Sequence, residues 1–248
     1  MKELQGHDYI ILLETATDSC SVALSDGESL IAEKYSAVPK AHDTLLAKIT
    51  EEILQEHGLK ATDCKAVAVS SGPGSYMGLR IAASLAKGLA YGADIDLISV
   101  GTLDVIAQCA IDSGLPEKVA GIEKGENFTI VPMIDAGRME VYTANYSPEC
   151  EELTKIEAKV LNSGSYKEEL SKGKILFTGN GAEKFRRMLE QELGTIPENA
   201  FFAEQIPHAS GLRIKAYRAL QKGLKEDCAY FQPFYLKDFI PGKSKKLL

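Results

Sequence analysis

The chain has 248 residues, of which 45% are hydrophobic and 25% are charged, enough apolar material for one large domain or two of ordinary size. Lysine and arginine number 28 against 35 aspartate and glutamate residues, so the net charge is −7. This balance argues against a protein that grips nucleic acid over its own surface, and it suits a soluble protein with a basic partner.

The cysteines and the N-terminal residues indicate the cellular compartment of the protein. Five cysteines are scattered along the chain without a C-x-x-C pair: Cys20, Cys64, Cys109, Cys150 and Cys228. An odd number of separated cysteines is typical of free thiols in a reducing compartment. The apolar run at residues 9–13 is too short for a signal peptide or a membrane span. We therefore expect a cytoplasmic protein that does not contact a membrane.

The first 36 residues predict a meander of three strands. Residues 10–13 form an apolar run, residues 21–25 form a second strand, and residues 29–36 form a third. The Asp-Gly pair at 26–27 is a signal for the hairpin that joins the last two. The first turn carries an acid and two threonines: Glu14, Thr15 and Thr17.

A helix is predicted next, from about Asp43 to His57, with Gly58 placed to end it. Apolar residues recur along it at helical spacing and form the expected core stripe: Leu45, Leu46, Ile49, Ile53 and Leu54. His42 stands at the start of this helix. It is most simply a capping or interface residue, because an isolated histidine without a carboxylate neighbour is rarely catalytic.

Residues 66–93 form a strand, a glycine turn and a helix. The apolar run 66–69 predicts a buried strand, the sequence Ser-Ser-Gly-Pro-Gly-Ser at 70–75 breaks it, and Ser75 can cap the following helix. This arrangement offers backbone N–H groups to an anion. The turn matches neither G-x-x-x-x-G-K-[ST] nor G-x-G-x-x-G. The sequence at 70–75 is compatible with a purely structural turn and with a phosphate-binding turn.

The helix after this turn is apolar for a surface helix. From Leu79 to Ala93 its only charges are Arg80 and Lys87, which lie seven residues apart on one side. Most other positions are leucine, isoleucine, alanine or glycine, so the helix should be covered on two sides. Either its own domain buries it, or a second protein covers its outer face.

We place a domain boundary between Val100 and Leu115, which gives an N-terminal lobe of residues 1–108 and a C-terminal lobe of residues 109–248. A strand at 97–100 precedes a helix that Thr102 can cap. The sequence Ser-Gly-Leu-Pro at 113–116 then breaks that helix, and the weakly patterned residues 117–128 follow.

The second half repeats the outline of the first. A buried strand at 129–134 leads into an acidic turn at Asp135, and strands at 140–146 and 157–161 follow. The remaining predicted elements are a short helix near 166–170, a strand at 174–177, a glycine turn with Gly179 and Gly181, a helix at 182–193, a strand at 200–203 and a helix at about 210–224. The last helix is a candidate to pack back on the first lobe.

This duplicated order indicates an α/β fold of two lobes built from mixed sheets, as in the actin-like ATPase and sugar-kinase (ASKHA) superfamily. In that superfamily the acidic and glycine turns close on nucleotide phosphates between the lobes. The identity between the two halves is negligible, so the match is one of pattern.

Two long strings and several short ones resemble the TsaB (YeaZ) family. The long strings are ILLETATDSCSVAL at 11–24 and SSGPGSYMGLRIAASLAKGLAYG at 70–92. The short ones are SVGTLDVIA, IDAGRMEVY, TGNGAEKF and QPFYLKD, and all occur in family order along nearly the whole chain. The chain departs from the family pattern at Tyr76-Met77, where Phe-Thr is usual, and at Gly137, where arginine is usual.

The resemblance implies a protein without turnover of its own that serves as a partner of TsaD, the enzyme that transfers a threonylcarbamoyl group to adenosine 37 of tRNAs reading ANN codons. An ATPase, TsaE, completes the complex, and the protein would contact tRNA only as part of that complex. The helices at 43–57 and 75–93 would pack on matching helices of TsaD. The expected interface residues are His42, Leu45, Leu46, Ile49, Ile53, Tyr76, Leu79, Arg80, Ala82, Ala83, Ala86, Lys87 and Ala90. An apolar face of this kind also predicts a homodimer when the protein is alone.

The sequence also bears on whether the chain holds a nucleotide or a metal. The expected nucleotide positions are Glu14, Thr15, Thr17, Gly179 and Gly181, and we interpret them as the remains of a site without a bound cofactor. No catalytic residue is assigned. With only four histidines and no H-x-x-x-H pattern, no metal site is expected. A small ATPase or phosphotransferase of the same superfamily remains the alternative, with Glu14 and Asp135 as its candidate acids, and a metallopeptidase is a more distant one.

Overall fold

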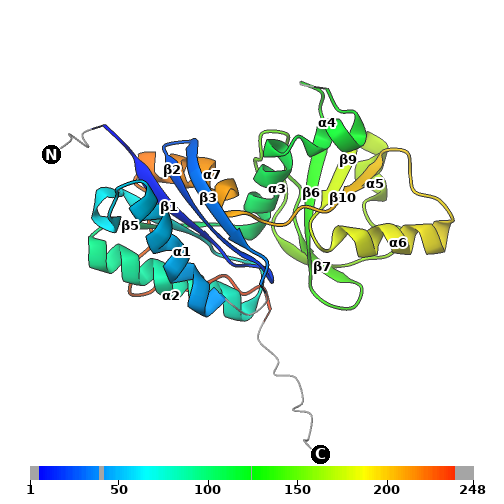
Figure 1. Ribbon diagram of the computed structural model, residues 1–248. Helices are drawn as coiled ribbons and strands as arrows, with labels where there is room; N and C mark the ends of the chain where they lie inside the picture. Colours follow the sequence, from blue (N-terminus) through cyan, green and yellow to red (C-terminus); the bar gives the residue numbers. More distant parts are fainter. Residues whose placement is uncertain (1–5, 39–41, 124, 238–248) are drawn as a thin grey trace, which may run out of the picture.

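The computed structural model describes residues 6–38, 42–123 and 125–237, except for the side chains of His42 and Asp43. Each of its two lobes is built around a five-stranded mixed sheet with helices on both faces (Figure 1). The two sheets have strand orders β3-β2-β1-β4-β5 and β8-β7-β6-β9-β10, which are the same order when each lobe is counted from its own first strand. The α/β two-lobed actin-like fold is therefore confirmed.

The first lobe starts with an antiparallel meander and continues with parallel strands. Its elements are β1 (Tyr9–Glu14), β2 (Cys20–Asp26), β3 (Ser29–Ser36), α1 (His42–Glu56), η1 (Ala61–Asp63), β4 (Ala66–Ser70), α2 (Tyr76–Ala93) and β5 (Asp96–Val100). Strand β1 alternates its side chains between two cores. Ile11 and Leu13 pack beneath α1 and α2, while Ile10 and Leu12 pack on the opposite face.

The second lobe repeats this plan with shorter strands. Its elements are α4 (Leu115–Ala120), β6 (Thr129–Asp135), β7 (Glu140–Thr143), β8 (Glu157–Val160), α5 (Lys167–Lys172), β9 (Ile175–Thr178), α6 (Ala182–Leu193) and β10 (Ala200–Ala203). Helix α4 is absent from the prediction, which treats Pro116 as a breaker. Pro116 lies in the first turn of α4, where a proline costs no hydrogen bond.

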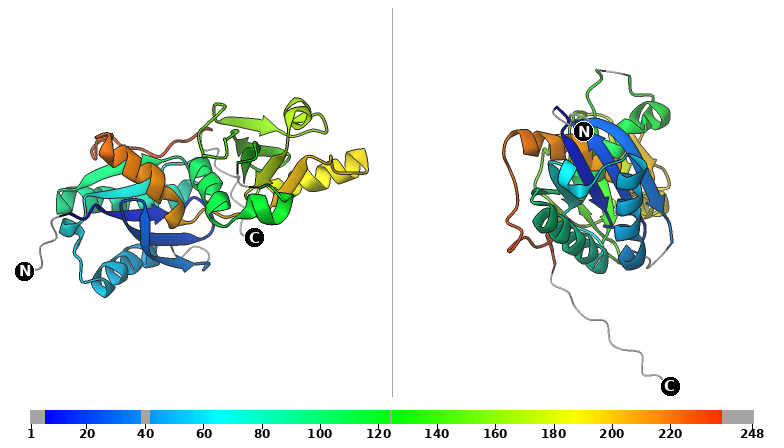
Figure 2. Two further views of the ribbon diagram at one scale, coloured as in Figure 1. Left: turned by 90° about the horizontal axis from the view of Figure 1, so that it is seen from above. Right: turned by 60° about the vertical axis from the view of Figure 1, so that its left-hand side comes forward.

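Helix α3 (Thr102–Asp112) lies between the lobes and belongs to both of their cores. Val105 and Cys109 pack with the first lobe, whereas Leu103, Ile106 and Ala107 pack with the second. The chain returns from β10 through η2 (Ala209–Leu212) into α7 (Arg213–Gln221), which lies on the first sheet (Figure 2). The predicted helix at 210–224 is thus a short 3-10 turn followed by a shorter α-helix.

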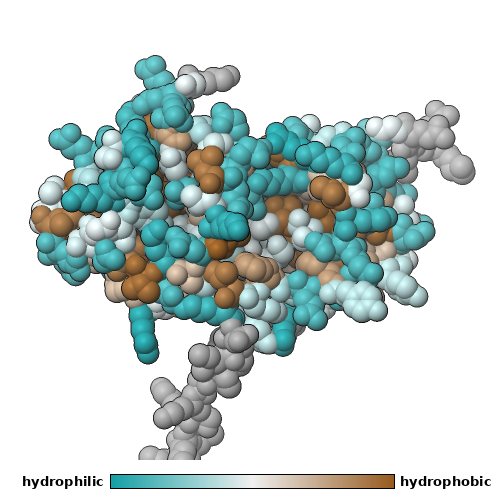
Figure 3. Space-filling view, turned by 180° about the vertical axis from the view of Figure 1, so that it is seen from behind, coloured by the Kyte–Doolittle hydropathy of each residue, from teal (hydrophilic) through white to brown (hydrophobic). Residues whose placement is uncertain are grey.

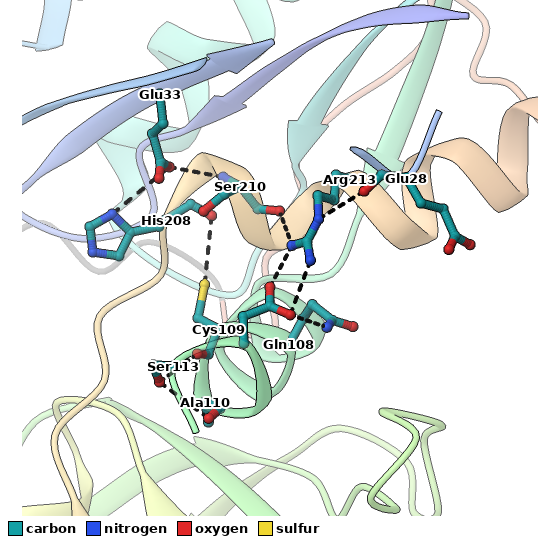
Figure 4. Close-up of polar contacts among 10 residues, drawn as sticks. Glu28, Glu33, Gln108, Cys109, Ala110, Ser113, His208, Ser210 and Arg213 are labelled. Carbon is teal, nitrogen blue, oxygen red and sulfur yellow. Dashed lines mark hydrogen bonds and ion pairs between the residues drawn. The ribbon is translucent and has the colours of Figure 1, made fainter. Parts of the chain in front are cut away.

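The return segment is fastened to α3 and to the first sheet by polar contacts (Figure 4). The guanidinium of Arg213 forms a bidentate ion pair with Asp112 and donates to the carbonyl of Glu28 at 3.0 Å. The backbone N–H of Ser210 donates to the Glu33 carboxylate at 2.9 Å. Residues far apart in sequence are therefore held together where the two lobes meet.

Candidate functional site

Helices α1 and α2 lie side by side on one face of the first sheet (Figure 1). The start of α2 is fixed by Ser75, whose hydroxyl oxygen accepts from the Gly78 N–H at 3.3 Å, as expected for an N-cap. The helix ends at Asp94, which takes a left-handed conformation with φ of 54°. These caps set the length of the surface that α2 presents.

Many of the predicted interface residues face the core of the chain itself. The buried members of that set are Leu46, Ile49, Ile53, Leu79, Ala82, Ala83, Ala86 and Ala90. Their small or aliphatic side chains let α1 and α2 approach the first sheet closely. Apart from Leu46, which also lines the groove described next, these side chains offer little surface to a docking partner. Whether the predicted residues contact a partner stays a prediction. The side chain of His42 lies outside the described residues.

The outer side of the helix pair is hollowed. A groove of about 320 Å³ runs between α1 and α2, and we call it the α1–α2 groove. Its lining residues are Leu46, Ala47, Arg80, Ile81, Ser84 and Leu85. Ile81 and Leu85 are only half-buried, and Leu45 is the half-buried member of the predicted set on α1. Met77 and Tyr91, 64% and 88% exposed, extend this apolar surface along α2.

Sequence reasoning missed Met77, Ile81, Leu85 and Tyr91. The signal was present, because residues 77, 81, 85, 88 and 91 recur every three or four positions along one side of the helix. The prediction puts the partner on the alanine-rich side of the helix, which is the side that the sheet covers.

The segment 225–235 forms a strap along the flank of α2. Phe231 is buried in the same core as α1 and α2, and the Phe234 N–H donates to the Ser71 carbonyl at 2.7 Å. Tyr235 contacts both predicted polar residues at the start of α2: its ring lies 4.9 Å from that of Tyr76, and its hydroxyl accepts from Arg80 at 3.3 Å. Lys87 donates to the Ala229 carbonyl at 3.4 Å. Arg80 and Lys87 therefore both contact the strap, and Arg80 also lines the groove.

The acidic turn of the first lobe is closed on itself. The Glu14 carboxylate is buried and accepts from the Ala16 N–H at 2.5 Å, and burial raises its pKa to about 7. The Thr15 hydroxyl donates to the Gly78 carbonyl at 2.8 Å, and Thr17 contacts Ser19 at 3.0 Å. The three side chains thus make internal contacts with the turn itself and the start of α2.

The acidic turn of the second lobe is also held by internal contacts, although Asp135 itself is exposed. The Asp135 carboxylate lies 2.6 Å from Lys184 Nζ and accepts from the Gly137 N–H, and these contacts lower the pKa of Asp135 in spite of partial burial. Gly179, with φ of +97°, packs so closely that a Cβ there would lie 2.4 Å from the Met133 carbonyl oxygen. Gly181 donates its N–H to the same carbonyl at 2.9 Å. These glycines serve close packing of the turn on β6.

A cysteine, a histidine and a glutamate also meet where the lobes join. Cys109 Sγ lies 3.8 Å from the backbone carbonyl of His208, while the His208 ring points toward Glu33 and away from the sulfur (Figure 4). Burial raises the pKa of the Cys109 thiol to about 12. This geometry does not pair a nucleophile with a base.

The described residues include neither a candidate metal site nor a helix that could span a membrane. Across 6–38, 42–123 and 125–237, no three or more His, Cys, Asp and Glu side chains converge as a candidate metal site. Within the same ranges, every helix is too short or too polar to cross a bilayer.

Comparisons with known proteins agree with the fold. The family model described as TsaD, tRNA N6-adenosine threonylcarbamoyltransferase, matches residues 36–240. The TsaB protein of Escherichia coli (strain K12) is 35% identical over 137 residues, which are 55% of this chain and 54% of that protein. The TsaB protein of Bacillus subtilis (strain 168) is 27% identical over 191 residues, covering 75% of this chain and 77% of that protein.

Solved structures agree with the sequence relatives. A Pseudomonas aeruginosa protein described as similar to the peptidase YeaZ superposes with a TM-score of 0.73 at 25% identity, over 93% of this chain and 100% of that one. The chain spans about half the length of the Escherichia coli and Haemophilus influenzae relatives that it matches. From the matched family model, the relatives and the fold together, the chain belongs to the TsaD protein family and, within it, to the TsaB (YeaZ) group.

Proposed function

We propose that the protein acts in the biosynthesis of threonylcarbamoyladenosine in tRNA as a non-catalytic subunit that binds and activates TsaD. The reaction that it supports is threonylcarbamoyl transfer to adenosine 37 of tRNAs reading ANN codons. TsaE is the further member of the complex, and the protein meets tRNA only through that complex. In this proposal the protein works in the cytoplasm, binds no nucleotide of its own, and forms a homodimer when TsaD is absent.

The α1–α2 groove is the observation that carries the proposal. Its half-buried walls, Ile81 and Leu85, and its exposed neighbours Met77 and Tyr91 leave an apolar surface uncovered on an acidic, soluble chain. Exposed apolar surface of this kind is typical of a protein–protein interface. A helix of a partner would lay its apolar side into such a groove.

The closed acidic turns support a non-catalytic role. Glu14 and Asp135 are the acids that an ATPase of this fold would use, and both are engaged within the chain. Neither carboxylate lines the α1–α2 groove.

The test is co-purification with the TsaD of the same organism, using Ser84→Glu. Ser84 is exposed in the groove and its hydroxyl donates to the carbonyl of Arg80, so the substitution leaves the core intact. A carboxylate buried without a partner in the complex should weaken binding at least about tenfold. Ala86→Glu does not serve here, because Ala86 is fully buried and its replacement would unfold the lobe.

The matched control is Thr195→Glu, a change of an exposed hydroxyl residue in the second lobe that should leave binding unchanged. A complex that survives Ser84→Glu would remove the groove from the interface. If the wild-type protein forms no complex with TsaD, the proposed subunit role is refuted. ATP binding by the isolated chain would then favour the phosphotransferase alternative.

A further inference from the structure

The strap at 225–235 leads the chain to one end of the α1–α2 groove. It runs from the end of α2 toward its start, where the Tyr235 hydroxyl accepts from Arg80 at 3.3 Å. Arg80 is itself a lining residue, so Tyr235 lies at the edge of the groove. Two residues later, Lys237 forms an ion pair with Glu140 of the second lobe. The strap therefore leaves the next part of the chain beside the start of α2.

The segment that follows, residues 238–248, has a composition that suits the groove. It lies outside the described residues, and its sequence is Asp-Phe-Ile-Pro-Gly-Lys-Ser-Lys-Lys-Leu-Leu. Two apolar pairs thus stand on either side of a Pro-Gly turn signal and three lysines. Eleven extended residues span up to about 36 Å, whereas the 18 residues of α2 span about 27 Å. The segment is long enough to run along the whole groove from the strap.

Negative charge lies at the end of the groove farthest from the strap. Helices α1 and α2 start at the same end of the pair, so their last turns also lie together (Figure 1). Glu51 follows the lining residue Ala47 by one turn of α1 and is exposed. It accepts from Gln55 at 2.9 Å and has no ion pair with a described residue. Asp94 is exposed at the end of α2, where the helix dipole also favours a cation. The lysines of the segment therefore have acidic partners within reach.

We propose that residues 238–248 bind in the α1–α2 groove of their own chain and compete there with TsaD and with a second copy. The competition rests on the proposed function of the groove. A short tether gives the segment an effective concentration in the millimolar range, so weak contacts suffice to hold it. A groove that is open only part of the time binds its partners more weakly by that fraction. On the face shown in Figure 3, apolar residues lie among hydrophilic ones and give the segment a less continuous surface.

The first experiment places one cysteine in the groove and one in the segment of the full chain. A short bismaleimide should join Ser84→Cys to Ser244→Cys within one chain at nanomolar protein concentration, and peptide mapping identifies the joined pair. Thr195→Cys with Ser244→Cys is the matched control, because Thr195 is exposed on the second lobe. Equal yields for the two pairs would show that the segment has no preferred place and would overturn the proposal. Cross-linked dimers would assign the groove to a second copy, which would also overturn it.

The second experiment removes the last apolar pair of the segment. Leu247→Asp with Leu248→Asp should lower the yield of the Ser84–Ser244 cross-link and strengthen TsaD binding, each by about threefold or more. Leu153→Asp with Val160→Asp adds the same two charges at positions of the second lobe that are 57% and 65% exposed, and it should change neither.

The two readouts separate this proposal from the proposed function. An unchanged cross-link yield in Leu247→Asp with Leu248→Asp would overturn binding of the segment in the groove. A lower yield with unchanged TsaD affinity would overturn the competition. If the wild-type protein binds no TsaD, the subunit role is refuted, while the cross-link yields still decide whether the segment occupies the groove.

Discussion

Glu14 places a carboxyl group inside the first lobe, at the end of β1. One oxygen accepts from the Ala16 N–H, while the other, Oε2, has no hydrogen-bond partner in the part of the chain that the structure describes. Burial outweighs that hydrogen bond and raises the pKa from 4.5 to about 7. The sequence placed this acid in a polar turn but did not reveal its burial, because spacing along the chain does not show that the start of α2 covers the turn.

The raised pKa predicts a specific pH dependence of stability. In the folded protein Glu14 keeps its proton up to about pH 7, whereas in the unfolded chain it loses the proton near pH 4.5. The folded state binds more protons between these values, so the free energy of unfolding falls as pH rises through this window. The loss is complete above about pH 7 and amounts to roughly 3 kcal/mol.

Urea unfolding of wild type and Glu14→Gln between pH 5 and pH 8 measures this effect. The glutamine keeps an oxygen for the Ala16 N–H and carries no charge, so the variant should gain stability relative to wild type as pH rises. Parallel pH profiles for the two proteins would contradict the assignment of the titration to Glu14.

At the scale of the element, α2 was predicted well in extent and poorly in orientation. Its length and its Ser75 cap follow from local sequence, and both are found. Which side it buries depends on the sheet below it, and a helix that is apolar or small nearly all round carries a weak directional signal. The strap at 225–235 was also missed, because its contacts with α2 join residues more than 140 positions apart.

Two glycines of α2 give opposite predictions for the same substitution. A Cβ at Gly78 would lie 2.0 Å from the Thr15 carbonyl oxygen, because the first turn of α2 rests on the acidic turn. At Gly88, no atom of the described residues would lie within 4 Å of a Cβ. Gly78→Ala should therefore cost about 3 kcal/mol through overpacking, while Gly88→Ala should stabilise the helix by about 1 kcal/mol.

Thermal and urea unfolding of both variants measure these changes. If Gly78→Ala unfolds at the same temperature and urea concentration as wild type, the acidic turn must be able to move away from the start of α2. A destabilising Gly88→Ala would mean that something covers this part of the helix in the isolated protein.

For the whole molecule, the proposed self-association gives a further prediction. Sedimentation velocity at micromolar concentration should show a dimer for wild type and a monomer for Ser84→Glu, because both copies would bring the same apolar groove to the interface. Thr195→Glu should remain a dimer. A wild-type protein that sediments as a monomer would refute self-association without bearing on the TsaD proposal.

The overall architecture was largely readable from the sequence. Hydrophobic runs, the Asp-Gly hairpin and the glycine turns predicted the order of strands, turns and helices that repeats along the chain, and the segment 182–193 was found as a helix with the predicted bounds. Long-range packing could not be read in this way. The fit of α3 into both cores depends on Leu103 and Val105 facing opposite ways, and that requires both lobes to be in place.

The strap and α7 also bear on how the protein is made. The core beneath α1 and α2 includes Phe231, and the core on the other face of the first sheet includes Ala209, Leu212 and Ala216. The first lobe is thus completed by residues that leave the ribosome only after the strands of the second lobe have been made. During synthesis the α1–α2 groove lacks the strap along α2 until residues 225–235 have been made. A chaperone that shields apolar surface therefore has the longest time to bind at this lobe.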